Sequence, residues 1–318
     1  MTPLKPHKVL TILISVFGAM TCGLALGRFY RPQYLDVIVF LALFLMLYPT
    51  MLEVDFTAVR RVISNPGLVV AALFLNFLVS PVLIFGLLHL FGEISEPDLM
   101  VGITLYGSVP GGGMAPAFTG MLGGNVSLSV TIAAIGSVLS LGIVPLWAEF
   151  LIGAQMNVPP VLIFKHLCFI IVLPLIIAVL TRKIILKIKD ESAFDSVKER
   201  LRPLSGVGLS LILFAMSMLY GDRVLNEPFL ILRIAAPVSG FLITLFLLSW
   251  LVGRVFGSVY EDAIALTIST TAKNNAVSVA LVFSTFGADA ALINAIAGPL
   301  VQLPMLLGFV TLKNIRKK

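Results

Sequence analysis

The chain has 318 residues, of which 58% are hydrophobic and only 12% are charged, and its mean hydropathy is +1.05. Soluble domains carry about 25% charged residues, so this composition and its repeated long apolar runs exclude a soluble protein and predict a polytopic helical membrane protein. The net charge of +6 does not indicate nucleic acid binding, because the basic residues are grouped between apolar runs, where they set membrane topology.

The reactive side chains make no catalytic or metal-binding pattern. Cys22 and Cys168 both lie inside apolar runs, which favours two small core residues over a disulfide or a metal site. The three histidines are scattered near segment ends, and no Ser/His pair or carboxylate dyad is embedded at catalytic spacing. The sequence therefore predicts no enzyme, no metal and no cofactor.

Ten apolar segments follow one another along the chain. The first follows a short basic tail and leads through Gly27-Arg28 directly to the next segment, so it is interpreted as a span and not as a signal peptide. The third contains Asn76 and the pair Ser80-Pro81. The predicted spans are approximately Val9–Leu26, Leu35–Leu52, Leu68–Phe91, Leu99–Leu122, Val126–Leu151, Val161–Leu180, Leu204–Tyr220, Phe229–Val252, Thr267–Phe286 (entered from Glu261) and Ala290–Leu312.

The distribution of basic residues predicts the topology. The side that would hold both termini has 16 Lys and Arg, the opposite side has 5, and Lys273 lies within the membrane. This bias predicts an integral protein of the cell membrane with both termini in the cytoplasm. The charged stretch Arg182–Arg202 is interpreted as a solvated cytoplasmic loop that joins two units of five spans, residues 1–155 and 156–318. Five spans followed by five make any resemblance between these units an inverted repeat.

The fourth and ninth segments are each interrupted. Pro110 removes a backbone donor, and Gly111–Gly113 abolish helix propensity in the middle of an apolar run. Lys273 lies 12 residues after Glu261, roughly 18 Å along a helix and so near the centre of a hydrocarbon layer about 30 Å thick. A cation at that depth normally faces a cavity or a partner. We expect both helices to be broken, although a kinked fourth span stabilised by its neighbours is an alternative.

The two interruptions occupy equivalent positions. Asn125 follows Pro110 by 15 residues, and Asp289 follows Asn274 by 15 residues. Paired interruptions of this kind indicate the binding site of a transporter. If the helices cross, the N-termini of two half-helices, each with about half a positive charge, would meet beside Lys273. Either Lys273 is neutral in the empty state or an anion occupies the crossing, and both readings favour anion transport. A lysine that only satisfies carbonyl ends and never titrates is the alternative.

The motifs VPGGGMAPAFTGMLGGNVSLSV and TISTTAKNNAVSVAL resemble the bile acid/sodium symporter superfamily, which also contains the Acr3-type arsenite exporters. YPTMLEVDF after the second span resembles the arsenite-exporter side of that group. The resemblance implies an all-α polytopic membrane protein with ten transmembrane helices, arranged as two inverted five-helix repeats with broken, crossing helices 4 and 9. Spans 3–5 and 8–10 would form a core, and spans 1, 2, 6 and 7 a panel that moves against it.

Several positions depart from the family's sodium-binding pattern. A Ser-Asn pair is expected where Ala115 and Pro116 stand, and a Glu and a Gln where Thr271 and Asn275 stand. Sodium needs several oxygen ligands, and the acidic one is absent while a lysine lies two residues away. This argues against sodium coupling, and the lysine would stand where the charge of the ion would be.

Two further positions belong to the sodium-binding comparison, and a third bears on the substrate. Asn76 replaces a third-span Gln, whereas Ser129 in the fifth span is kept. Arsenite exporters place a thiol at the position of about Gly111, and this chain has no cysteine near it. Thiol-based arsenite transport is therefore disfavoured.

The sequence predicts a secondary active transporter that moves a small organic anion by alternating access, with H⁺ favoured over Na⁺ as the coupling ion. The alternatives are an arsenite or oxyanion exporter, a sodium-coupled bile-acid-type symporter and an anion pore. The expected partners are a small anionic substrate and the lipid bilayer, with no nucleic acid, and the oligomeric state is open. The predicted binding residues are Asn76, Pro110, Gly111, Gly112, Gly113, Ser129, Thr271, Lys273, Asn274 and Asn275.

Overall fold

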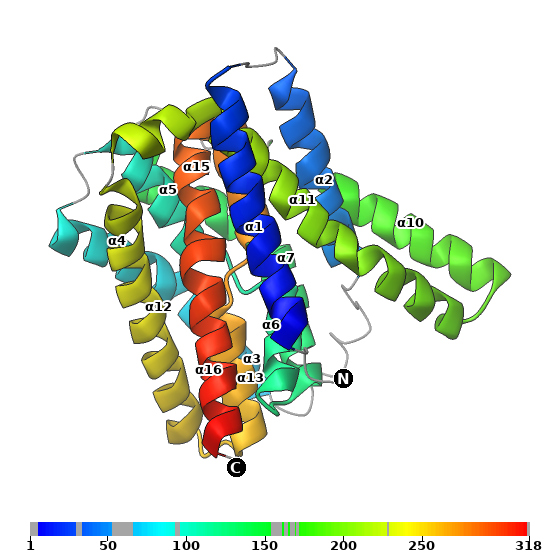
Figure 1. Cartoon of the computed structure of the whole chain (residues 1–318). Coiled ribbons are helices and arrows are strands. Elements are labelled where there is room, and N and C mark those ends of the chain that lie inside the picture. The colour runs from blue at the N-terminus through cyan, green and yellow to red at the C-terminus, as the bar shows by residue number, and fades with distance from the viewer. Residues whose placement is uncertain are drawn as a thin grey trace.

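The computed structural model describes residues 6–29, 34–52, 66–92, 96–153, 172–227 and 229–316, with single residues at 161, 165 and 169. Throughout these ranges the regular structure is helical and no β-strand forms, which confirms the predicted all-α class (Figure 1). Apart from those single residues, the first part of the predicted sixth span, with Cys168, lies outside the described residues. The helices are α1 (Pro6–Gly27), α2 (Leu35–Leu52), α3 (Pro66–Phe74), η2 (Leu75–Val79), α4 (Ser80–Phe91), α5 (Pro97–Ser108), α6 (Met114–Met121), α7 (Val126–Ala148), η4 (Glu149–Gly153), α10 (Leu173–Ile188), α11 (Glu191–Asn226), α12 (Leu230–Val255), α13 (Tyr260–Thr271), α14 (Asn275–Phe286), α15 (Ala288–Ala297), η6 (Gly298–Gln302) and α16 (Leu303–Arg316).

Several of these helices are suited to a membrane. Among the described residues, four are long and apolar enough to cross a bilayer, and the two parts of α7–η4 pass the same criterion together across a bend of 58°. Cys22 on α1 is exposed, so its predicted place in the core is wrong. The four long helices are Pro66–Phe91, Glu191–Leu219, Leu230–Val255 and Asp289–Lys313.

The helices pack in two groups. α1, α2, α10 and α11 contact one another at one side of the molecule (Figure 1). On the other side, α5, α13 and α14 contact α7, α12 and α15. Every residue from Leu99 to Ser108 in α5 and from Asp262 to Thr271 in α13 is buried, so these two short helices form the centre of the protein.

Two polar side chains of the centre come from π-helical turns inside apolar helices. The third predicted span is divided by η2, which contains Asn76, and the tenth is divided by η6, which ends at Gln302. A π-helical turn adds one residue to the helix and re-aims the side chains around it, and such turns are frequent at functional sites. The third and tenth spans are therefore less regular than their apolar sequences indicate.

The prediction of a loop at Arg182–Arg202 is wrong. α10 continues to Ile188 and α11 begins at Glu191, so only Lys189 and Asp190 separate the two helices. Lys, Arg and Glu are good helix formers, and the Asp190 carboxylate accepts hydrogen bonds from the N–H of Ala193 and the hydroxyl of Ser192, both at 2.9 Å. The stretch is charged and largely exposed, as expected, but it forms a helical hairpin.

Candidate functional site

The two interrupted helices meet at their breaks, as predicted. α5 and α6 are separated by residues 109–113, and α13 and α14 by residues 272–274. Gly111 and Lys273 form an antiparallel β-bridge. Gly112 N–H donates to the Ala272 carbonyl at 2.9 Å, and Asn274 N–H donates to the Pro110 carbonyl at 2.9 Å. Backbone groups that the helices leave unpaired are thus satisfied across the crossing, as a membrane interior requires.

The close approach of the two breaks depends on glycine. A Cβ on Gly111 would overlap the main-chain carbonyl of Ser269, and a Cβ on Gly112 would lie 2.8 Å from Cα of Asn274. Neither contact can be relieved by a side-chain rotation, because both partners are main chain. Gly113 has helical angles and caps α6. The glycine run therefore does more than weaken a helix, since it lets the second break pack against the first.

Lys273 is enclosed at the crossing. Its side chain is among the largest that are fully buried, with 1% of the residue's surface exposed. Nζ donates a hydrogen bond to Oδ1 of Asn76 at 3.0 Å and lies 5.7 Å from the centre of the Phe241 ring. Asn76 in turn donates from Nδ2 to the Ser269 carbonyl in the last turn of α13, at 3.3 Å. The amide therefore links the ammonium to a carboxyl-terminal helix end.

Gln302 holds the main chain of Lys273. Its Oε1 accepts from the Lys273 N–H at 2.8 Å, and its Nε2 donates to the Lys273 carbonyl at 3.2 Å. The Tyr106 hydroxyl donates to the same Oε1 at 2.6 Å. The sequence analysis missed this pair. The available signal was Gly298-Pro299, an interruption in the tenth apolar segment just before Gln302.

Four helix ends meet at the crossing, two of each polarity. α6 and α14 begin there, and the Asn274 side chain caps α14 by accepting from Val277 N–H at 3.3 Å. α5 and α13 end there, so partial negative charges accompany the two partial positive charges that the sequence predicts. No ion pair to Lys273 is present among the described residues.

The remaining predicted residues lie around this centre without contacting the ammonium. Ser129 on α7 is 2.8 Å from the Ser269 hydroxyl. Thr271 is buried, but its hydroxyl donates to the Thr267 carbonyl of its own helix at 2.6 Å. Asn275 is the first residue of α14, and its buried Oδ1 has no hydrogen-bond partner. Ser129 and Thr271 are thus peripheral, whereas Asn275 offers an unused acceptor at the crossing.

The described part of the chain holds no group of three His, Cys, Asp or Glu that could bind a metal. Apolar helices that are interrupted at mid-length and enclose a buried polar centre are characteristic of secondary transporters. The comparisons with known proteins agree. The chain belongs to the Sodium Bile acid symporter family, whose model matches residues 40–227. This is a family of transporters and not of enzymes.

Its relatives differ in their roles. Arsenical-resistance protein Acr3 of Corynebacterium glutamicum is 26% identical over 85% of this chain and 76% of the relative. An uncharacterized transporter of Synechocystis is 27% identical over 96% of this chain and 87% of the relative. A probable sodium/metabolite cotransporter of rice chloroplasts (Oryza sativa subsp. japonica) is 25% identical over 74% of this chain and 57% of the relative. The family resemblance seen in the motifs is confirmed, on the side that includes the Acr3 proteins.

Proposed function

We propose that this protein is a secondary active transporter that moves a small organic anion by alternating access, coupled to protons and not to sodium. The observation that carries the proposal is the environment of the Lys273 side chain. It is buried at the crossing of two broken helices, and its ammonium is hydrogen-bonded only to an amide. Among the described residues it has no carboxylate partner.

An anion would complete this site. A protonated lysine has three N–H donors, and the described residues use one of them. A buried unpaired charge is strongly unfavourable, so the empty site favours the neutral amine, and the bound anion favours the ammonium. Binding of the anion would then bring a proton with it, which is a direct physical basis for coupling the two.

The geometry around Lys273 also supports a sodium-independent cycle. The ammonium contacts the oxygen of Asn76, which stands at a third-span position of the family's ligand pattern. Thr271, at the position of the acidic ligand, has its hydroxyl engaged with Thr267. The charge of the lysine would replace the charge of the ion. Sodium would then lack its acidic ligand, and the ammonium would occupy the position of the ion.

The proposed architecture has ten spans, with residues 1–155 and 156–318 as inverted repeats and both termini in the cytoplasm. Gly123 and Gly287 support the repeat, because both have a positive φ and each follows its break, at Pro110 or Asn274, by 13 residues. The packing of α1, α2, α10 and α11 as one group supports a panel, and the remaining helices would form the core. Because Lys273 is buried, an anion would reach it only after a change of conformation, which favours alternating access over an open pore.

The test uses purified protein and the variant Lys273→Met, with Lys183→Met at an exposed position as the matched control. We expect carboxylates to raise the thermal midpoint of the wild type and of the control but not of Lys273→Met, with no further effect of sodium. In vesicles, the wild type should show saturable counterflow and uptake driven by a pH gradient, and Lys273→Met neither. Unchanged flux with an unchanged pH profile in Lys273→Met would overturn the role of the lysine. Absence of counterflow would favour a pore, and a sodium requirement would favour a sodium-coupled symporter.

Export of an arsenic species is the second candidate, because the family members similar to this chain include arsenical-resistance proteins of two bacteria. Two observations argue against a thiol mechanism. Gly111 stands at the position of the fourth-span thiol, and Cys22, the cysteine among the described residues, is exposed on α1. Arsenite is largely uncharged at neutral pH and does not need a cation. Arsenite resistance conferred on a sensitive host by both the wild type and Lys273→Met would favour this candidate.

A further inference from the structure

The hairpin of α10 and α11 contains a cavity that is separate from the helix crossing. Its volume is about 390 Å³, and it lies between the last turns of α10 and the first turns of α11. Apolar residues line both sides of it, and each side carries one cation. The apolar residues include Ile184, Ile185, Ile188 and Val197, and the cations are Lys189 and Arg200.

The apolar lining continues onto the surface of the protein. Ile184 is 58% exposed and Ile188 is 74% exposed, although both lie in a stretch that also carries Lys183 and Lys187. Exposed isoleucines interleaved with lysines are suited to the membrane boundary, where acyl chains cover the apolar groups and the lysine ammonium groups remain in water. This end of the hairpin therefore has the composition of a membrane interface.

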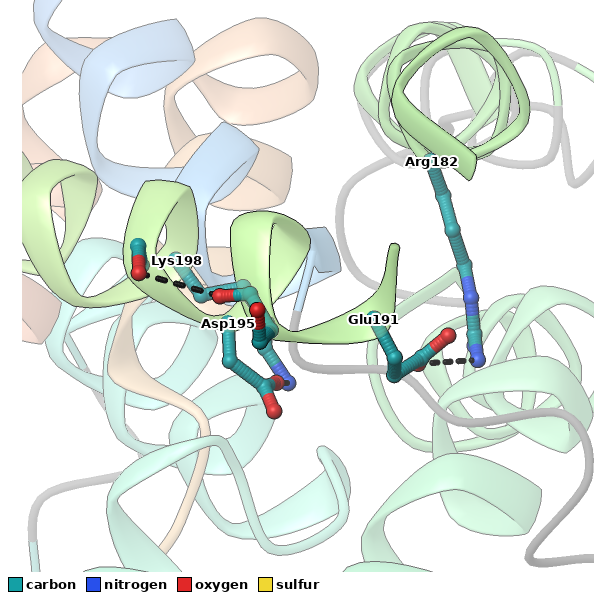
Figure 2. A network of polar contacts seen from close by, with 6 residues as sticks. Arg182, Glu191, Asp195 and Lys198 are labelled. Carbon is teal, nitrogen blue, oxygen red and sulfur yellow. Dashed lines mark hydrogen bonds and ion pairs between the residues drawn. The ribbon is translucent and has the colours of Figure 1, made fainter. Parts of the chain in front are cut away.

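Two ion pairs lie in the hairpin, and one of them joins its two helices. Figure 2 shows Arg182 of α10 bound to Glu191 at the start of α11, at 2.9 Å, and Lys198 bound to Asp195, at 2.6 Å. Arg182 and Lys198 also lie over the buried Phe194 ring, 5.4 and 5.1 Å from its centre. The turn is thus fixed by contacts that do not involve the cations of the cavity.

The two cations of the cavity, Lys189 and Arg200, differ from these paired charges. Neither takes part in an ion pair among the described residues, and both side chains are exposed at the cavity. The nearby Asp190 carboxylate caps α11 through Ala193 and Ser192. Two cations without an ion pair among the described residues therefore face a cavity with apolar lining, although Lys189 also interacts with the Asp190 carboxylate next to it.

We propose that this cavity binds an anionic phospholipid, with an acyl chain along the isoleucines and the phosphate between Lys189 and Arg200. Basic pockets between membrane helices bind anionic headgroups. A zwitterionic lipid would leave the two positive charges uncompensated, and a soluble anion would leave the apolar lining uncovered. The site is independent of the transport site, so each can be tested without the other.

Native mass spectrometry of the purified full chain, titrated with phosphatidylglycerol or with phosphatidylcholine of the same acyl chains, measures the occupancy directly. We expect specific binding of phosphatidylglycerol, weakened about thirty-fold in Lys189→Gln/Arg200→Gln, because each basic residue contributes about a five-fold attraction to anionic lipid. The matched control is Lys183→Gln/Lys187→Gln, which removes the same charge from α10 without altering the cavity lining. It should bind within about two-fold of the wild type.

Three outcomes would overturn the proposal. Equal loss in both double variants would show a non-specific effect of charge. Equal binding of phosphatidylcholine would show that the cations do not select the lipid. Full competition by glycerol phosphate would show a site for a soluble anion. An additional variant, Ile188→Asn, distinguishes a lipid site from a site for a soluble anion. In a lipid site it should weaken the binding of phosphatidylglycerol without changing the binding of glycerol phosphate. All variants lie at exposed positions, and unchanged thermal midpoints without lipid would show that they fold.

Discussion

Gln302 binds both main-chain polar groups of Lys273, which stands 29 residues before it. The side-chain amide thereby pairs with the Lys273 main chain as a neighbouring β-strand would, and Lys273 also forms the β-bridge to Gly111. The Tyr106 hydroxyl holds the same amide from α5. The position of the lysine is thus set by its backbone as well as by the contact between its ammonium and Asn76.

Replacing Gln302 with Leu should destabilise the protein and impair transport. The Lys273 N–H and carbonyl would lose their bonds to the amide and keep those to the Thr271 carbonyl and from the Asn275 N–H, and each lost hydrogen bond costs about 0.5–1.5 kcal/mol. We expect a thermal midpoint lower by several degrees and a reduced maximal flux. Tyr106→Phe removes a single hydrogen bond from the same amide, so it should cost only about 1 kcal/mol. A Gln302→Leu protein as stable and active as the wild type would contradict the positioning role of the amide.

Replacing Asn76 with Asp should weaken anion binding while keeping the side-chain shape. A carboxylate oxygen would then stand where Oδ1 now lies, 3.0 Å from the ammonium. The ion pair would compensate the charge that we propose the substrate compensates, so anion affinity should fall about tenfold or more. Titration of the thermal midpoint with carboxylates measures this. Asn76→Gln, which keeps the amide, is the control, and an Asp variant that binds anions normally would count against Lys273 as their partner.

Gly111→Ala should disrupt the crossing, because the added Cβ would overlap the Ser269 carbonyl. Overpacking of this kind costs about 1–3 kcal/mol even where the structure can adjust. Gly86 in α4 is the matched control, since a Cβ there meets nothing within 4 Å. Gly86→Ala should be neutral or stabilising by about 0.5–1 kcal/mol. Thermal midpoints and expression levels compare the two, and equal behaviour would show that the breaks need not touch.

Local chemistry explains which parts of the site could be predicted from the sequence. Pro110 and the three glycines cannot sustain a helix wherever they stand, and a lysine in an apolar run requires a partner whatever its neighbours are. Asn76 is visible for the same reason, as an amide within an apolar segment. The effect of each of these residues depends on its own chemistry and not on distant neighbours. The two breaks, and the contact between them, could therefore be predicted from the sequence.

The residues that were missed depend on packing between distant segments. Tyr106 and Gln302 are 196 residues apart, and each alone resembles an ordinary polar residue near a helix end. Phe241 is one of 22 phenylalanines, and only the fold brings its ring to the ammonium. The π-helical turns that aim Asn76 and Gln302 inward do not alter the hydrophobic pattern. The helical hairpin at Lys189-Asp190 was missed because charge density was read as a loop, although its residues favour helix.

Asp190, in the turn between α10 and α11, gives the protein a local dependence on pH. Hydrogen bonds from the Ala193 N–H and the Ser192 hydroxyl hold the pKa of the Asp190 carboxyl below its usual value. A lowered pKa in the folded state means that the cap stabilises α11 fully above the usual carboxyl pKa of about 4. Its contribution is lost as the pH falls from there through the lowered value.

Hydrogen exchange of the first turns of α11, corrected for intrinsic rates, measures this effect. In the wild type, protection should be constant at neutral pH and decrease below about pH 4. Asp190→Asn caps a helix without titrating, so its protection should not depend on pH in this range. Asp190→Ala should be less protected at every pH. Loss of protection in Asp190→Asn at the same acid pH as in the wild type would assign the transition to another carboxylate of the hairpin.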